Sequence, residues 1–167
     1  LSGHLHVQHC KRSEDNRGIW EMVTASLATP SCKYAILTYR DDRSFLYRTQ
    51  SLDVEAWAKK NQCTEEDLLN FKQFQTPFLR RVFYNQAIAS LNEVPELTDS
   101  EREQMAQLYS LLKFHYYQGT AYQVQEPVRN DPAYELWQED GMATQQGEYF
   151  RYILEDGKRD YNRLEVN

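Results

Sequence analysis

Apolar and polar residues alternate along most of the first fifty positions, which is the spacing of β-strands. Residues 1–10, 19–28, 32–40 and 44–49 show this pattern, and polar turn residues separate them. Successive side chains of a strand point to opposite faces, so the alternation gives each strand one face to bury. Short connections cannot cross over to a parallel neighbour. The pattern therefore predicts an N-terminal antiparallel meander of four strands.

The middle of the chain changes to the 3.6-residue spacing of amphipathic helices. Helices are predicted to begin near three positions, Asp53, Thr64 and Thr98. Thr98 and Glu101 match the capping box, in which each side chain bonds the backbone amide of the other residue. Pro77 has no amide hydrogen, so a kink or a helix restart is predicted there. Gly119 is placed to end the last of these helices.

After residue 119 the alternation returns. Two short segments, 122–124 and 133–138, are predicted as strands. A hairpin is predicted over 149–166, because Asp156-Gly157 is a preferred turn pair between two aromatic and aliphatic runs. The predicted fold class is α+β, with an N-terminal antiparallel meander, central helices and a C-terminal β-hairpin that joins the sheet. No long linker interrupts the chain, so residues 1–167 are predicted to form a single α+β domain.

Composition fits this prediction and narrows the function. The chain has 167 residues, 41% hydrophobic and 26% charged, with a net charge of -6. These values indicate a folded, soluble protein with a core of its own. Binding along nucleic acid needs a concentrated surface of Lys and Arg, so the negative charge makes nucleic acid an unlikely partner. No apolar run approaches the 18 or more residues of a membrane span.

The three cysteines are compatible with either an oxidising compartment or the cytosol. Cys10, Cys32 and Cys63 are too few and too far apart in sequence for a zinc knuckle or a C-x-x-C redox pair. In an oxidising compartment Cys10 and Cys32 are the expected pair, whereas in the cytosol all three would be small buried apolar residues.

A candidate metal site lies at the start of the chain, in the sequence His4-Leu5-His6. In a strand, His4 and His6 lie on one face about 6.5 to 7 Å apart, so that two imidazoles can share one divalent ion. A third ligand would have to come from elsewhere, such as Cys10, His115 or an acid. The cofactor predicted by this pattern is a divalent metal.

His4-Leu5-His6 also resembles the His-hydrophobic-His element of rolling-circle replication endonucleases and relaxases. In that family the two histidines hold a metal that helps a tyrosine to attack a phosphodiester. The resemblance covers only these three residues, and it implies a metal-dependent enzyme of the hydrolase or phosphodiesterase type.

Four consecutive rings, Phe114, His115, Tyr116 and Tyr117, lie on the helix predicted from Thr98. A helix turns by about 100° per residue, so four rings in a row cannot all face one core. Some of them must meet the sheet, a ligand or another chain. They are the candidate binding surface, and a homo-oligomer is one way to cover it.

The chain shows no Gly-rich phosphate loop, no Gly-x-Ser-x-Gly elbow and no His-Glu-x-x-His helix. The leading prediction is therefore a non-catalytic module that recognises a partner protein or a small apolar ligand between the helices and the sheet. The alternative is the metal-dependent enzyme that uses His4 and His6. Sequence alone does not decide whether the protein is an enzyme.

Overall fold

The computed structural model describes residues 6–14, 18–27, 29 and 31–166 and shows an α+β protein, as the sequence predicts. Contacts divide these residues into two compact units. The sheet unit holds the described residues up to Phe78, together with Tyr117–Gly119 and the described residues from Tyr161 on. The helical unit holds Leu79–Tyr116 and Thr120–Asp160.

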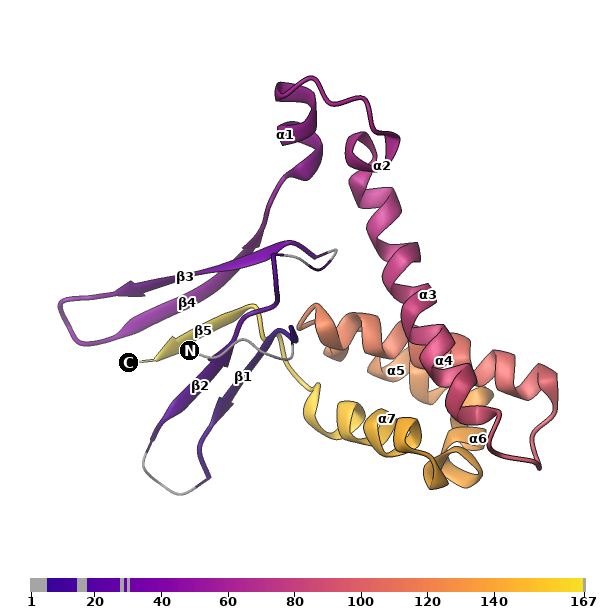
Figure 1. Cartoon of the computed structure of the whole chain (residues 1–167). Coiled ribbons are helices and arrows are strands. Elements are labelled where there is room, and N and C mark those ends of the chain that lie inside the picture. Colours follow the sequence, from indigo (N-terminus) through magenta and orange to yellow (C-terminus); the bar gives the residue numbers. More distant parts are fainter. Residues whose placement is uncertain (1–5, 15–17, 28, 30, 167) are drawn as a thin grey trace. The chain divides into compact units, whose positions relative to one another are not determined.

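The strands of the described residues belong to two antiparallel sheets, both in the sheet unit (Figure 1). The smaller sheet pairs β1 (His9–Arg12) with β2 (Trp20–Val23). The larger sheet has the order β3-β4-β5, formed by β3 (Lys33–Tyr39), β4 (Phe45–Ser51) and β5 (Arg163–Val166). The continuous meander of four strands is wrong in one respect, because no pairing joins β2 to β3 among the described residues.

A cluster of buried residues from both sheets and from the segment just before β5 forms the core of the sheet unit: Cys10, Met22, Tyr47, Tyr161 and Leu164. Gln8 is fully buried beside it and donates to the Tyr47 hydroxyl (3.1 Å) and to the Tyr161 carbonyl (2.8 Å). The same side chain accepts from the amide of Ala25, just after β2 (3.3 Å). In a continuous meander, the chain would run on from β2 into a pairing with β3. Here the Ala25 amide after β2 donates to the Gln8 side chain instead.

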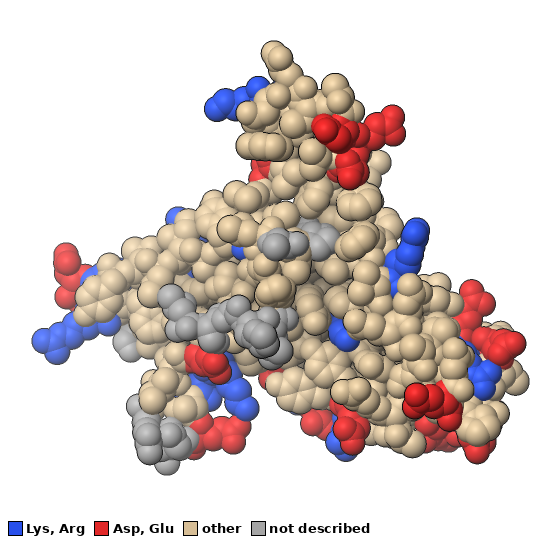
Figure 2. Space-filling view, viewed as in Figure 1, with Lys and Arg blue, Asp and Glu red and all other residues tan. Residues whose placement is uncertain are grey.

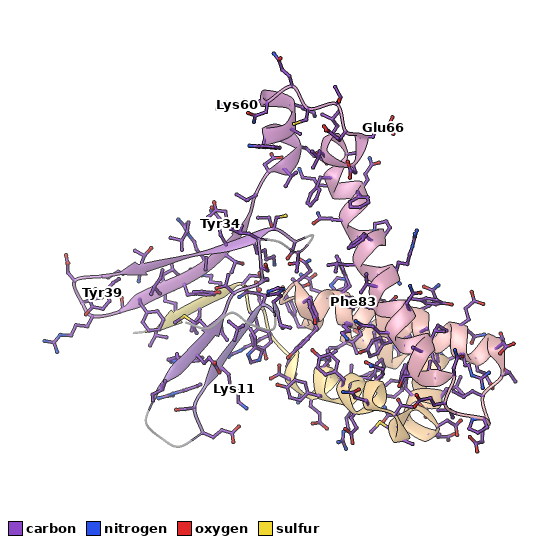
Figure 3. All side chains as sticks on the ribbon, in the orientation of Figure 1. Lys11, Tyr34, Tyr39, Lys60, Glu66 and Phe83 are labelled. Atoms are coloured by element: carbon purple, nitrogen blue, oxygen red, sulfur yellow. The ribbon has the colours of Figure 1, made fainter. Side chains whose placement is uncertain are left out.

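Two short helices follow β4 in the sheet unit. α1 (Val54–Lys60) begins where the sequence predicts, and the Asp53 carboxylate accepts from the Ala56 amide at its start (3.1 Å). α2 (Glu66–Leu69) comes next, and Figure 3 shows Lys60 at the end of α1 and Glu66 at the start of α2. The apolar residues of α1 are only partly buried. Ala58 is buried, but Trp57 is 56% exposed.

α3 (Phe71–Leu91) runs through Pro77 as one helix, so the predicted restart at this proline is wrong. Proline leaves one carbonyl of the preceding turn without its helical donor. Pro77 lies on the exposed side of α3, where water can supply that hydrogen bond. Phe74, in the first turn of the helix, is 42% exposed. The buried stripe of the helix consists of Leu79, Phe83, Ala87 and Leu91.

α4 (Asp99–Tyr117) begins at the predicted capping box. The Glu101 carboxylate accepts from the Thr98 amide (2.7 Å), and the Thr98 hydroxyl accepts from the Glu101 amide (3.3 Å). Gly119, two residues beyond the helix, has a φ of 71°. This left-handed conformation suits glycine and ends the helix as predicted.

Every segment between Gly119 and Gly157 that was predicted as a strand is helical. The elements here are η1 (Ala121–Gln123), α5 (Gln125–Arg129), α6 (Ala133–Glu139), η2 (Gly141–Ala143) and α7 (Gln145–Asp156). Of the predicted C-terminal hairpin, only the second arm is a strand. This arm is β5, which joins the sheet by pairing with β4, Phe45 opposite Val166.

The core of the helical unit contains large aromatic residues from three helices. Trp137 is fully buried, its indole N–H donates to the Met105 carbonyl (3.0 Å), and its ring stacks on Phe150 with centroids 5.1 Å apart. Tyr109 also packs against Trp137, with ring centroids 5.6 Å apart. Burial of such rings supplies much of the stabilisation of a small helical core.

Among the described residues, no helix combines the length and the apolar character needed to cross a bilayer. None of the three cysteines, Cys10, Cys32 and Cys63, forms a disulfide among the described residues. On the face shown in Figure 2, Lys and Arg side chains lie near Asp and Glu side chains, so charges of the two signs are interspersed.

Candidate functional site

A buried lysine marks the most unusual place in the helical unit. Lys113 lies on α4 and is only 7% exposed. It follows Tyr109 by four residues, so it belongs to the helix face that packs into the core. Lysine is rarely buried to this extent unless its charge is paired. The partners of its ammonium group therefore decide what the site can do.

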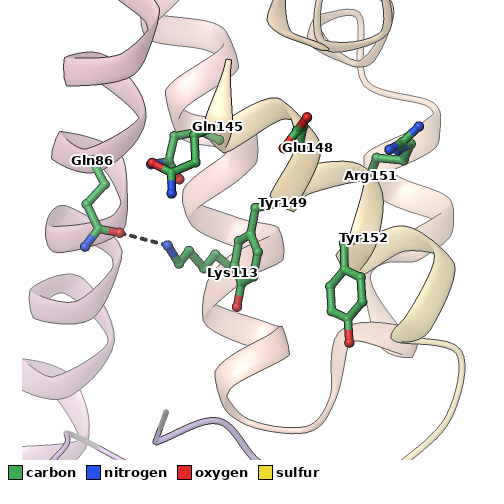
Figure 4. Close-up of a pocket in the computed structure, with 8 residues that line it drawn as sticks. Gln86, Lys113, Gln145, Glu148, Tyr149, Arg151 and Tyr152 are labelled. Atoms are coloured by element: carbon green, nitrogen blue, oxygen red, sulfur yellow. Dashed lines mark hydrogen bonds between the residues drawn. The ribbon is translucent and has the colours of Figure 1, made fainter. Parts of the chain in front are cut away.

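Two neutral side chains hold the Lys113 ammonium. The Nζ atom donates to Gln86 Oε1 on α3 (2.8 Å) and to the Tyr109 hydroxyl (2.9 Å). Figure 4 shows Lys113 reaching toward Gln86, with Tyr149 of α7 beside it. No ion pair joins Lys113 to a carboxylate of the described residues. An ammonium has three N–H groups, so two of them are accounted for.

Aromatic rings surround the same nitrogen. Lys113 Nζ lies 5.1 Å from the centroid of Phe83, 5.1 Å from that of Tyr109 and 4.9 Å from that of Tyr149. Figure 3 shows Phe83 on α3. The negative face of an aromatic ring attracts a cation, which recovers part of the solvation lost on burial.

These contacts do not replace water fully. Burial lowers the pKa of Lys113 from its ordinary 10.5 to about 8. Desolvation disfavours the charged form of an amine, and here no carboxylate of the described residues opposes that effect. A lysine whose pKa is shifted by burial beside a hollow is a candidate functional residue.

Lys113 lies at the side of an open groove of about 780 Å³. The groove is lined by polar and aromatic side chains, namely Gln86, Lys113, Gln145, Gln146, Glu148, Tyr149, Arg151 and Tyr152. Its volume falls in the range typical of small-molecule sites, which is about 300 to 1,000 Å³. The lining offers two cations, one carboxylate, amides and two phenol rings.

α7 forms most of this lining because of how it begins. The Thr144 hydroxyl caps the helix by accepting from the Gly147 amide (3.0 Å). Gly147 lies so close to the backbone of Gly141 that no Cβ would fit between them. The helix that follows buries Phe150, Ile153 and Leu154 and turns its other face, from Gln145 to Tyr152, to the groove.

The four rings predicted as a binding surface have separate environments. Tyr116 is buried, its hydroxyl donates to Asp156 Oδ2 (3.3 Å), and burial raises its pKa. Phe114 and His115 are half-buried and meet edge to face, with His115 Nδ1 3.1 Å from the Thr120 hydroxyl. Tyr117 belongs to the sheet unit. A partner surface formed by these residues stays a prediction.

The predicted metal ligands lie at the edge of the described part of the chain. His4 lies outside it, and β1 begins at His9, so His6 precedes the strand, exposed and with a φ of 56°. The described residues contain no group of three or more His, Cys, Asp or Glu that could hold a metal. Cys10 is buried in the sheet core, where its thiol approaches the Tyr161 carbonyl (3.6 Å). A metal site at His4 and His6 stays a prediction.

Comparison with known proteins classifies the helical part of the chain. Residues 53–160, well over half of its length, match the family described as the C-terminal domain of cyclic nucleotide phosphodiesterase. The chain belongs to this family. No curated protein matches the chain. The matched residues contain all the helices from α1 to α7, whereas β1 to β4 precede them and β5 follows.

Proposed function

We propose that the chain is the C-terminal part of a cyclic nucleotide phosphodiesterase, in which residues 53–160 serve as a non-catalytic binding domain. The family match carries this proposal, since it assigns these residues to the C-terminal domain of such an enzyme. The groove beside Lys113 lies within the matched residues and gives the domain a place to bind a ligand. Its lining is more polar than the apolar ligand predicted from sequence would need.

The metal-dependent activity predicted from the histidine pair belongs, in this proposal, to the part of the enzyme that precedes the binding domain. His4 and His6 lie before residue 53, outside the matched range. The exposed ring of His6 is accessible to an ion, but the described residues supply no further ligands for it. When bound, a divalent metal polarises phosphoryl oxygens and activates water.

Metal content and hydrolysis test both parts of this proposal. The complete enzyme that carries this chain would be compared with its His4→Ala/His6→Ala variant, by metal analysis and by hydrolysis of cyclic AMP. We expect the variant to lose bound metal and at least about 100-fold in hydrolysis, because loss of even a residue that hydrogen-bonds to a metal ligand typically lowers metal affinity or activity by about 10- to 100-fold. His9→Ala changes a nearby histidine outside the pair and should keep both properties.

Two results would contradict the proposal. Full hydrolysis by the His4→Ala/His6→Ala variant would show that the histidine pair is not required for catalysis. Absence of cyclic nucleotide hydrolysis by the metal-loaded wild-type enzyme would remove the assigned activity itself.

A further inference from the structure

β3 forms a free edge of the larger sheet, because the strand order is β3-β4-β5 and no strand of the described residues pairs with its outer side (Figure 1). At one end of β3 the Arg40 amide donates to the Ser44 carbonyl (3.0 Å), and at the other end the Cys32 carbonyl accepts from the Leu52 amide (3.0 Å). In an antiparallel pair, residues that bond the neighbouring strand alternate with residues whose backbone groups point away from it. Even-numbered residues of β3 therefore bond β4, and odd-numbered residues point their N–H and C=O groups to the free edge.

Ala35, Leu37 and Tyr39 are the odd-numbered residues that leave this edge open. Within the part of the chain that the structure describes, their outward N–H and C=O groups form no hydrogen bond. Leu37 is 48% exposed and Tyr39, near the end of β3 in Figure 3, is 70% exposed. Residues 34–39 include no charge and no proline, which are usual means of protecting an edge strand. The edge can therefore pair with a further strand.

A cleft of about 390 Å³ adjoins β3 on the side that faces the core of the sheet unit. Ala35 and Leu37 belong to one wall of the cleft, and Ala25 and Leu27, from the segment after β2, belong to another. Leu27 is 54% exposed, so the cleft is open to solvent. A further strand would place one of its side chains opposite Ala35, on this side of the sheet and against the cleft.

We propose that β3 pairs antiparallel with β3 of a second copy of this chain. A two-fold axis perpendicular to the sheet passes between the two Leu37 residues, and Ala35 of each copy lies opposite Tyr39 of the other copy. Outward-pointing residues face one another in this register, so the open N–H groups of each copy donate to the open carbonyls of the other. The ring of Tyr39 occupies the cleft of the other copy, and the two three-stranded sheets become one sheet.

Size and charge both favour a second copy in this register. The large ring of Tyr39 meets the small side chain of Ala35, and the two Leu37 side chains meet each other, which covers apolar surface that is exposed in one copy. Beyond these pairs, Asp41 of one copy lies opposite Lys33 of the other, so opposite charges meet at both ends of the paired strands. A register that sets Lys33 opposite Tyr39 loses this pairing of charges.

Sedimentation equilibrium of the 167-residue chain and its Leu37 variants tests the proposal. We expect the wild type to form a dimer with a dissociation constant below about 1 mM. Leu37→Lys and Leu37→Glu each place like charges opposite one another at the two-fold axis, so each should raise that constant at least about tenfold. A mixture of the two variants places opposite charges there, and it should form a heterodimer more tightly than either variant dimerises alone. Salt should weaken this heterodimer.

Leu52→Lys is the matched control. Leu52 is about as exposed as Leu37, 50% against 48%, and it follows β4, outside both β3 and the cleft. Its replacement should leave the dissociation constant unchanged. Circular dichroism of each variant shows that it remains folded.

Amide exchange of the wild type tests the register without a substitution. The amides of Leu37 and Tyr39 are open in one copy and bonded in the dimer. Raising the protein concentration through the dissociation constant should therefore slow their exchange at least about tenfold. The amides of Ile36 and Thr38 bond β4 in both states, so their exchange should change less.

Three results would overturn the proposal. A wild type that remains monomeric at about 1 mM excludes the second copy and leaves the β3 edge to a strand from another protein. A dimer that persists unchanged in Leu37→Lys and Leu37→Glu uses another surface. Exchange at Leu37 and Tyr39 that does not depend on protein concentration shows that dimerisation leaves this edge open.

Discussion

At the scale of single residues, Lys113 shows how a fold can keep a charge that costs stability. A leucine or methionine at this position would pack among Phe83, Tyr109 and Tyr149 without losing solvation. The two hydrogen bonds and three ring contacts of the ammonium offset only part of its burial, as its lowered pKa shows. Polar groups retained in this way are typical of binding sites, where a ligand completes the pairing.

Lys113→Met should reveal the cost as a pH dependence. The pKa of the folded protein, about 8, lies below the ordinary 10.5. Between these values the unfolded chain binds more protons, so wild-type stability rises with pH there. We expect the variant to be more stable than the wild type by about 1 to 2 kcal/mol near pH 7, allowing for its lost hydrogen bonds. Urea denaturation should show this advantage shrinking from pH 8 to pH 10.5.

The comparison isolates Lys113 because Tyr109 and Tyr149, the titratable rings around it, are present in both proteins. Glu148 and Arg151 also line the groove and are unchanged. Lys158→Met, at an exposed position, should follow the wild-type profile. If the free energy of unfolding changed with pH in parallel for the wild type and Lys113→Met, burial would not shift the pKa of Lys113.

At the scale of elements, α7 depends on a glycine inside its first turn. Gly147→Ala would raise intrinsic helix propensity by about 1 kcal/mol, but the new Cβ would collide with the Gly141 carbonyl group. Backbone cannot give way as cheaply as a flexible side chain. We therefore expect a net loss of about 1 to 3 kcal/mol in the free energy of unfolding, measured by urea denaturation. Gln145→Ala, on the exposed side of the same turn, should stay within about 0.5 kcal/mol.

The same helix shows where sequence patterns mislead. Asp156-Gly157 resembles a hairpin turn, yet Phe150, Ile153 and Leu154 also have the spacing of a buried helix face, and the structure follows that spacing. Periodicity decides poorly between strand and helix in short runs, such as Tyr122 to Val124, because three or four residues fit both patterns. Other predictions are confirmed. β3, β4 and the capping box of α4 lie where the sequence predicts them.

The candidate site was predictable only in part. The face of α4 could be derived from its apolar residues, and Lys113 falls on that face four residues after Tyr109. Sequence does not say that Gln86 and α7 approach the same point, because those contacts join positions far apart in the chain. The aromatic run Phe114–Tyr117 was predicted as the binding surface because of its composition. The residue of α4 that lines the groove is Lys113, which directly precedes this run.

At the scale of the whole molecule, the helices are an insertion between two paired strands. The chain leaves the larger sheet after β4, forms α1 to α7 and returns as β5, which pairs with β4. It passes between the two compact units at four points, and two of these lie inside α3 and α4. A discontinuous unit of this kind cannot be cut out as one segment. The topology therefore favours cooperative unfolding of residues 1–167 as a single domain.

Asn162 provides the test of that cooperativity. In the sheet unit its Oδ1 accepts from Lys33 Nζ (2.6 Å) and from the Thr49 hydroxyl (2.7 Å), and its Nδ2 donates to the Gln118 carbonyl (3.0 Å). Asn162→Ala removes these three hydrogen bonds, although Lys33 Nζ still donates to the Gln118 carbonyl (2.6 Å), so we expect a loss of about 2 to 3 kcal/mol. Exposed Arg163, the next residue, provides the control Arg163→Ala, which should change stability by less than about 0.5 kcal/mol.

The fluorescence of Trp137 shows whether Asn162→Ala also destabilises the helical unit. The other tryptophans, Trp20 and Trp57, lie in the sheet unit, so a Trp20→Phe/Trp57→Phe background leaves Trp137 as the only fluorescent indole. If the chain unfolds as one domain, Asn162→Ala lowers the urea midpoint of Trp137 fluorescence and accelerates amide exchange in β4 by matching free energies. An unchanged Trp137 transition beside faster exchange in β4 would show instead that the two units unfold separately.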